Sequence, residues 1–358
     1  MTPQKRKYRT KRWIVYVLFV LLLALTIYVL TAILEYNSPH GINQAEGIYC
    51  QPEDTIDVVM LGTSHVHCDI NTALLWEQYQ IAAYDYSGAE QPLWMTYYYL
   101  KELYKTQSPQ LIVLDLYAPA RFKEDYQYDW IDENIWGMKF SPNKLEMLLT
   151  STQGSRLFDY FPAFMSYHYR YKELKAEDFN HFFQNAEDRA ACKGYTPYFG
   201  ITEVPKPAES VFEGVTDPDS TYQALTAKSE QYLRKMIEYA KKQGSEILLV
   251  SAPYLVTAED EETYLAVEKL AEEYQVDFID YNRHYEEMGL DFATDFNDES
   301  HLNYAGSCKY TRLLGEHIAP YLEAADKDLE NPAVAEAYAT WDRHAELIRE
   351  AVKEDVKQ

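Results

Sequence analysis

The sequence is poor in positive charge. Its 358 residues include 33 Lys and Arg against 57 Asp and Glu, which gives a formal net charge of -24. A chain this acidic is unsuited to holding nucleic acid or another polyanion by bulk attraction, so an anionic wall polymer would need a local basic patch. No internal repeat is evident. With 47% hydrophobic and 25% charged residues, the chain is not disordered and can form one large domain or two modest ones.

Charge, proline and glycine are absent from residues 13–34, WIVYVLFVLLLALTIYVLTAIL. The length matches the roughly 20 residues that cross a bilayer core as a helix, so we expect a transmembrane helix in contact with membrane lipid. Residues 1–12 form a basic tail without acidic residues, which predicts a cytoplasmic N-terminus and an extracytoplasmic location after Leu34. A cleaved signal peptide fits less well, because the stretch is longer than a normal h-region and no A-x-A-like site follows it.

Cysteine is also scarce, with only Cys50, Cys68, Cys192 and Cys308 in the chain. An exported domain occupies a compartment in which disulfides persist. An even number of cysteines does not by itself assign pairs. Bridged cysteines and unpaired, partly buried cysteines therefore remain equally good interpretations.

After a polar linker over residues 35–51, short apolar runs alternate with helical stretches. The runs expected to be strands are 57–62, 81–87, 111–117, 246–253 and 276–282. The stretches expected to be helices are 72–80, 94–106, 221–242 and 258–274. This alternation is typical of a parallel sheet buried on both faces. We predict an α/β domain over residues 52–325 with a doubly wound, flavodoxin-like sheet of five parallel strands.

An aromatic-rich segment, residues 118–219, interrupts this rhythm. A structureless loop of that length would be improbable, so we expect a helical insertion or cap. Its aromatic residues either form the small core of a lid or line a groove in which exposed Tyr and Trp stack on sugar rings. Residues 326–358 are helix-prone and highly charged, which predicts a solvated C-terminal helical tail.

Polar residues follow the first expected strand in DVVMLGTSHVHCDI, residues 57–70. Ser64 lies where backbone N–H groups and a helix N-terminus favour negative charge. The same Gly-Thr-Ser stretch would also serve as a simple turn and N-cap. A nucleophilic serine further requires a base and an acid that orients the base.

An acid and a base with suitable spacing occur in DFNDESHLNY, where Asp298 precedes His301 by three residues. Asp178 and His181 repeat the spacing inside the insertion. Only Asp298 and His301 follow the final expected strand, at the edge of the sheet where Ser64 is expected. The sequence therefore favours these two as the partners of the serine.

A metal site is the competing interpretation of the opening stretch, because His65, His67, Cys68 and Asp69 are all potential ligands. His-x-His on an extended segment points both rings one way, but in a helix beginning at His65 the two rings diverge. No second cluster completes a ligand shell. We therefore expect no metal and no other cofactor, and we expect His65 to line the pocket or to pack beside the serine.

Three motifs, VVMLGTSH, YDYSGAEQP and DESH, resemble the first, second and fifth blocks of the SGNH hydrolase superfamily. GTSH in place of the GDS form, with one anchor and an exported domain, is similar to membrane-tethered SGNH-like proteins of cell-envelope acylation. These include alginate acetyltransferase-like proteins and the teichoic-acid D-alanyl transfer protein. The resemblance covers roughly residues 52–322 without the insertion. It implies that Ser64 is the nucleophile, His301 the base and Asp298 its orienter, with the N–H groups of Ser64 and Gly88 as oxyanion donors.

One block departs from that pattern. The superfamily has a Gly-x-Asn-type element after the third strand, whereas this chain has LDLYAPARF with Asp115. Losing one oxyanion donor typically costs about 10²–10³ in rate. Either Gln91 or another donor substitutes, or the protein is a poor hydrolase, which would suit an acyl carrier or transferase.

The resemblance implies a membrane-anchored serine acyl esterase or O-acyltransferase that modifies a cell-surface glycan or wall polymer. Water or a sugar hydroxyl would accept the acyl group. A polytopic membrane O-acyltransferase is a candidate partner, and nucleic acid is not. The alternative is a catalytically weak scaffold or glycan-binding protein that retains the fold.

Overall fold

The computed structural model describes residues 3–34, 38–160, 168–175, 179, 189–216, 222–322, 327 and 331–357. The chain divides into two compact units. One comprises Met1–Asn37 with Gly154–Gln184, and the other comprises Ser38–Gln153 with Asn185–Gln358. The sheet and the candidate site belong to the second unit.

The first unit contains helix α1 (Pro3–Leu34), in which Lys11–Thr31 is long and apolar enough to cross a membrane. Two short helices, α9 (Leu157–Tyr160) and η2 (His168–Lys172), belong to the same unit. Arg170 of η2 donates from Nη1 to the carbonyl oxygen of Leu34 at 3.1 Å. A basic side chain at this end of α1 satisfies a terminal carbonyl and complements the helix dipole.

The second unit is an α/β domain built on a sheet of five parallel strands, as predicted. The strands are β1 (Val58–Leu61), β2 (Ala83–Asp85), β3 (Leu111–Asp115), β4 (Glu246–Ser251) and β5 (Asp277–Asp280). Their spatial order is β2-β1-β3-β4-β5. This is the doubly wound order in which the chain reverses direction beside β1, so the loops after β1 and β3 diverge and leave a crevice.

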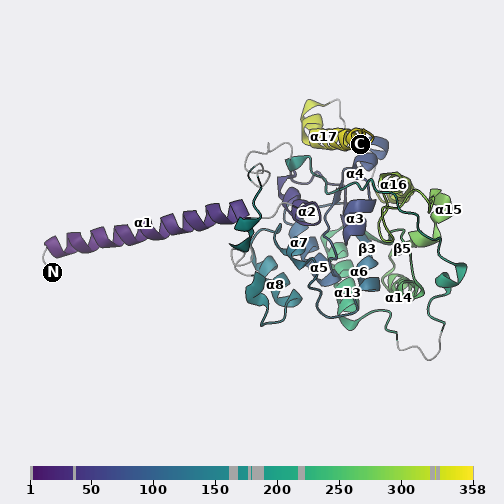
Figure 1. Ribbon diagram of the computed structural model, residues 1–358, viewed down its shortest axis with the longest axis horizontal. Helices are drawn as coiled ribbons and strands as arrows, with labels where there is room; N and C mark the ends of the chain where they lie inside the picture. The colour runs from purple at the N-terminus through teal and green to yellow at the C-terminus, as the bar shows by residue number, and fades with distance from the viewer. Residues whose placement is uncertain are drawn as a thin grey trace. The chain divides into compact units, whose positions relative to one another are not determined.

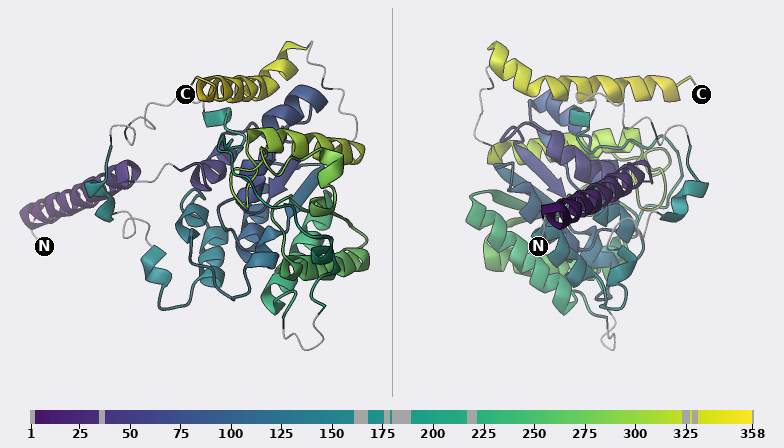
Figure 2. Two further views of the ribbon diagram at one scale, coloured as in Figure 1. Left: turned by 45° about the vertical axis from the view of Figure 1, so that its right-hand side comes forward. Right: turned by 90° about the vertical axis from the view of Figure 1, so that its left-hand side faces the viewer.

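Helices cover both faces of the sheet (Figures 1 and 2). The helices on one face are α3 (Ser64–Asp69), α4 (Thr72–Tyr79) and α16 (Tyr304–Ile318), and those on the other are α5 (Leu93–Leu103), α13 (Ala227–Gln243) and α14 (Ala258–Tyr274). The four predicted helical stretches correspond to α4, α5, α13 and α14. Gly244, at φ 91°, ends α13 as the sequence indicated, but the helix starts at Ala227 rather than at residue 221, because Thr226 caps its N-terminus.

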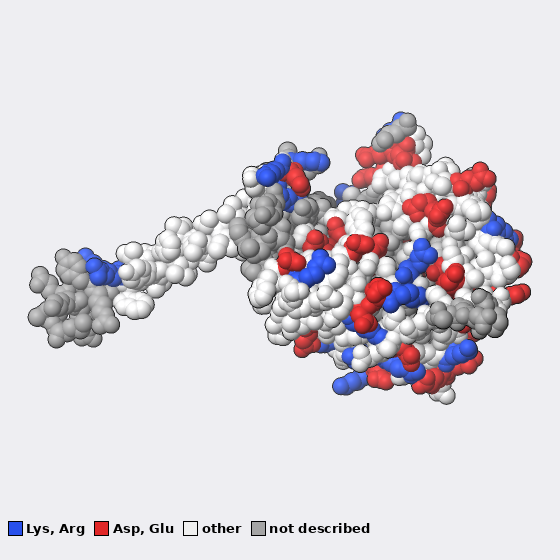
Figure 3. Space-filling model, turned by 60° about the horizontal axis from the view of Figure 1, so that its bottom comes forward, with Lys and Arg blue, Asp and Glu red and all other residues white. Residues whose placement is uncertain are grey.

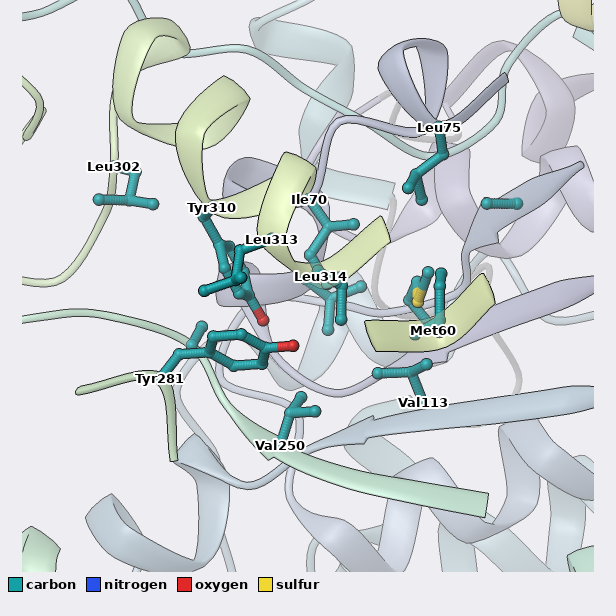
Figure 4. Close-up of a cluster of buried hydrophobic side chains, with 14 of the residues drawn as sticks. Met60, Ile70, Leu75, Val113, Val250, Tyr281, Leu302, Tyr310, Leu313 and Leu314 are labelled. Carbon is teal, nitrogen blue, oxygen red and sulfur yellow. The ribbon is translucent and has the colours of Figure 1, made fainter. Parts of the chain in front are cut away.

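Alternate residues of the strands build the core beneath α3, α4 and α16. Met60, Val113 and Val250 point toward Leu313 and Leu314 of α16 (Figure 4). Their neighbours in the strands are buried as well, which is why the strands read as continuous apolar runs. The same cluster includes residues that directly flank the candidate site, so the site rests on a rigid base.

The segment expected to be a polar linker is partly helical and packed. Residues 42–50 form α2 (Ile42–Gly47) and η1 (Ile48–Cys50). Ile42, Ala45 and Ile48 are buried because their spacing of three residues places them on one face. Gln44 Nε2 also donates to the carbonyl oxygen of Gly194 at 2.9 Å, which ties this segment to the end of the insertion.

The predicted C-terminal helix is present as α17 (Pro332–Asp355), but one of its faces is packed rather than solvated. Trp341 is fully buried, and the Lys193 ammonium lies 3.5 Å from the centre of its ring. His344 Nε2 lies 2.9 Å from Thr72 Oγ1 of α4. Ala345 and Ile348 are buried on the same face, so an apolar stripe docks this highly charged helix.

The described part of the insertion in the second unit is helical only in part, with α6 (Tyr117–Arg121), α7 (Ile131–Ile135), α8 (Pro142–Ser151) and η4 (Glu209–Glu213), whereas residues 191–208 form neither helix nor strand. Asp178 and His181 lie outside the described residues. The remaining short helices of this unit are η5 (Tyr281–Arg283), α15 (Tyr285–Met288) and η6 (Ala319–Tyr321). All four cysteines are unpaired.

Candidate functional site

Ser64, His301 and Asp298 form one hydrogen-bonded chain. Ser64 is the first residue of α3, immediately past the carboxyl end of β1. His301 Nε2 lies 2.8 Å from Ser64 Oγ, and His301 Nδ1 lies 2.9 Å from Asp298 Oδ1. Fold topology therefore brings Ser64 to an acid and a base that lie more than two hundred residues further along the chain.

The loop that carries Asp298 and His301 is held in shape by its own carboxylate. Asp298 Oδ1 accepts from the backbone N–H groups of Ser300 at 2.8 Å and His301 at 2.9 Å. Just beyond the loop, Leu302 is buried, and its N–H donates to Asp69 Oδ1 of α3 at 2.9 Å. The acid and base are thereby fastened to the same short helix that begins with the serine.

The Asp298 carboxylate is ionised in this arrangement. Partial burial opposes ionisation, but the hydrogen bond and charge of His301, with further bonds from Asn297 and Ser300, hold the pKa of Asp298 well below its usual value. An ionised acceptor at Nδ1 selects the tautomer in which Nδ1 carries the proton. Nε2 is then the free base facing the Ser64 hydroxyl.

His65 lies beside this chain and is not part of it. Its buried ring stacks on Tyr117 at a centroid distance of 3.9 Å and meets His301 edge-on at 5.4 Å. Burial first, and then the charge of His301, lower the pKa of His65 well below its usual value, so the ring is neutral. Tyr117 continues the wall, because its hydroxyl lies 3.1 Å from Ser300 Oγ. In the described part of the chain, no three His, Cys, Asp or Glu side chains are grouped to hold a metal ion.

Gly88 follows β2 and lies against the turn that precedes Ser64. Its N–H donates to the carbonyl oxygen of Gly62 at 3.4 Å, which is a long hydrogen bond. A Cβ at position 88 would lie 2.2 Å from Asn134 Oδ1. Only glycine fits this position, because the insertion presses directly on the loop.

Gln91, the expected substitute donor, has its amide engaged elsewhere. Gln91 Nε2 donates to Asn134 Oδ1 at 2.8 Å. Asn134 in turn donates to the carbonyl oxygens of Ala89 at 2.8 Å and Trp130 at 3.0 Å. These bonds make Gln91 and Asn134 a buried clamp on the Gly88 loop. Sequence analysis missed Asn134, because it lies in the insertion and no local motif marks it.

Two histidines hold the other side of the same loop. His67 Nδ1 lies 3.0 Å from Ser87 Oγ, and the N–H of Ala89 donates to the carbonyl oxygen of His40 at 2.6 Å. Burial first, and then the charges of His40 and His301, lower the pKa of His67 well below its usual value. His40 comes from the segment expected to be a linker, and its ring lies 5.9 Å from that of Trp130.

Asp115 is the last residue of β3, next to the block where the superfamily pattern has a Gly-x-Asn-type element. Its carboxylate accepts from the N–H of Ala252 at 3.0 Å and of Tyr117 at 3.1 Å. Burial raises the pKa of Asp115 to about 6, although these backbone hydrogen bonds oppose the shift. The side chain therefore joins the ends of β3 and β4 and offers no oxyanion donor while ionised.

The site can perform general-base activation of a hydroxyl nucleophile. An ionised acid orients an imidazole whose free nitrogen lies within hydrogen-bond distance of the serine oxygen, which is the geometry that such activation requires.

Neither a scan against protein-family models nor a search of curated proteins found a match to this chain.

Proposed function

We propose that the chain is a membrane-anchored serine acyl esterase or O-acyltransferase of SGNH type. The observation that carries this proposal is the continuous chain from Ser64 Oγ through His301 to Asp298. A buried strand, a nucleophile at the start of the next helix and a base on the loop before α16 are consistent with that superfamily. The β2-β1-β3-β4-β5 sheet is compatible with it.

In the proposed reaction, Ser64 Oγ attacks the carbonyl carbon of an acyl ester while its proton passes to His301 Nε2. The resulting oxyanion accepts from the N–H groups of Ser64 and Gly88. Collapse of the intermediate breaks the bond to the departing alcohol, which takes the proton from His301. The acyl-serine then transfers its acyl group to water or to a sugar hydroxyl, which His301 deprotonates, and the departing Ser64 Oγ takes that proton back from His301.

A weak oxyanion site supports a slow acyl-transfer enzyme in this proposal better than a rapid hydrolase. Asp115 accepts backbone hydrogen bonds and Gln91 Nε2 donates to Asn134, so in this proposal two backbone donors act without a third donor from either side chain. A missing donor slows each acyl step by about 10²–10³. A longer-lived acyl-serine is useful when the acceptor is a large cell-surface glycan or wall polymer delivered beside a membrane.

A fluorophosphonate probe tests the proposal directly, because it labels a serine only when a base activates it. The full-length protein in detergent should be labelled once, and Ser64→Ala should abolish the labelling. Ser210→Ala, at an exposed serine of η4, is the matched control and should label like the unchanged protein. Absence of labelling in the unchanged protein would reject the enzyme and favour a scaffold or glycan-binding protein that retains the fold.

A further inference from the structure

A cavity of about 580 Å³ is lined by residues of α6 and of the start of α14, and its described lining contains no member of the candidate triad. Its lining includes Tyr117, the residue that stacks on His65 and contacts Ser300 of the Asp298–His301 loop. Glu90, two residues past Gly88, lines it as well. The volume lies within the range of about 300–1,000 Å³ typical of small-ligand sites.

Part of the charged lining is committed to building the walls. Lys123 Nζ donates to the carbonyl oxygens of Pro119 and Ala224, both at 2.8 Å, and to Thr263 Oγ1 at 3.0 Å. Burial lowers the pKa of Lys123 to about 8. An ammonium group has three donors, so this one has none left for an anionic ligand.

Among the contacts of the described residues, Arg121 is the lining cation that retains hydrogen-bond donors. Its side chain is 43% exposed, and Nη1 lies 3.5 Å from Asp260 Oδ2. Its guanidinium carbon lies 5.6 Å from the centre of the Tyr117 ring. These contacts use a minority of the five N–H donors of a guanidinium group. Arg121 can therefore donate hydrogen bonds to a ligand while its charge stays balanced by Asp260.

Carboxylates outnumber cations around the cavity. The described lining includes Glu90, Glu259 and Asp260 against Arg121 and Lys123. Acidic and basic side chains are also interspersed on the face of the molecule drawn in Figure 3. Such a lining repels a phosphate chain, whereas its carboxylates accept hydrogen bonds from hydroxyl groups and Arg121 donates to hydroxyl oxygens.

We infer that this cavity is the acceptor subsite and that it takes an uncharged, hydroxyl-rich sugar unit of a glycan rather than a phosphate-rich polymer. That the cavity serves as an acceptor site rests on the proposed function. The binding itself is independent of the chemistry at Ser64. Tyr117 links the two, because one face of its ring supports His65 and the side chain forms part of the cavity wall.

Calorimetric titration of the full-length Ser64→Ala protein in detergent tests the inference without turnover. The probes are neutral trimers of glucose, mannose and N-acetylglucosamine, and a glycerol phosphate oligomer of similar length. At least one neutral trimer should bind, and the phosphate oligomer should bind more weakly than that trimer. Adding Arg121→Ala should weaken binding of the trimer about tenfold, which is the loss expected for one charge-assisted hydrogen bond.

Arg234→Ala is the matched control, because Arg234 of α13 pairs with Glu230 and Glu273 and is not among the described residues that line the cavity. It should leave trimer affinity unchanged. Tighter binding of the phosphate oligomer, equal effects of the two arginine substitutions, or no binding of any trimer would each overturn the inference. Trimer binding together with absent fluorophosphonate labelling would instead preserve the subsite and reject the proposed enzyme.

Discussion

Ser64 and His301 should behave as a unit when they are removed together. His301 Nε2 lies 2.8 Å from Ser64 Oγ, and every proton transfer proposed for His301 serves an acyl group carried by the serine, so the contribution of the base disappears with the serine. General-base assistance contributes about 10²–10⁴ in rate, so Ser64→Ala and His301→Ala should each reduce acyl turnover by at least about 10². If the two acted independently, the double variant would lose the product of both factors, about 10⁴–10⁸. We expect it to be little worse than either single variant.

The assay is turnover of a 4-nitrophenyl ester by the full-length protein, with thermal melting to show that each variant is folded. Asp298→Asn should be milder than His301→Ala, because the imidazole remains while its tautomer and orientation are disturbed. His181→Ala, which has the same sequence spacing from an acid, should hardly matter. Activity unaffected by Ser64→Ala would refute the nucleophile, and multiplicative losses would show that the pair does not share a proton-transfer step.

Four further outcomes are expected. Protease added to intact spheroplasts should digest the domain after Leu34, and protection there would reverse the proposed orientation. Loss of one oxyanion donor lowers kcat by about 10²–10³. Asn134→Ala should lower kcat by less than this, because the substitution loosens the Gly88 loop but leaves the Gly88 N–H in place. An unchanged kcat would contradict the proposed clamp. Burial raises the pKa of Asp115 to about 6. The protonated carboxyl group therefore adds to folding stability below the pKa that it has in the unfolded chain, and this contribution is lost as the pH rises through 6. Denaturant titrations should therefore show the wild type gaining about 2 kcal/mol over Asp115→Asn from about pH 7 to about pH 4, and a constant difference would refute this. Trp341→Ala should cost about 3–5 kcal/mol in the same assay, and no loss would mean that α17 is undocked.

Local patterns predicted the secondary structure because each strand and helix is decided by neighbours in the chain. Runs such as residues 111–117 are apolar on both faces, as expected of a parallel strand that is buried on both sides. Thr226 and Gly244 mark the ends of α13 by their preferences for capping conformations. The same reasoning failed for residues 42–50 and for the outer helix α17, because whether a short amphipathic segment is solvated depends on what surface lies opposite it.

The sequence by itself determined the α/β sheet, the membrane-capable helix and the candidates Ser64, Asp298 and His301, because strand ends and motif spacing are local properties. Only the tertiary structure decided how the site is completed. It turned the Gln91 amide toward Asn134, placed the His40 carbonyl on the Gly88 loop and set Arg121 in a cavity beside Tyr117. Each of these contacts joins polar groups whose partners come from other segments of the chain. Burial obliges such groups to find partners, but their identity depends on which segments the packed core brings together.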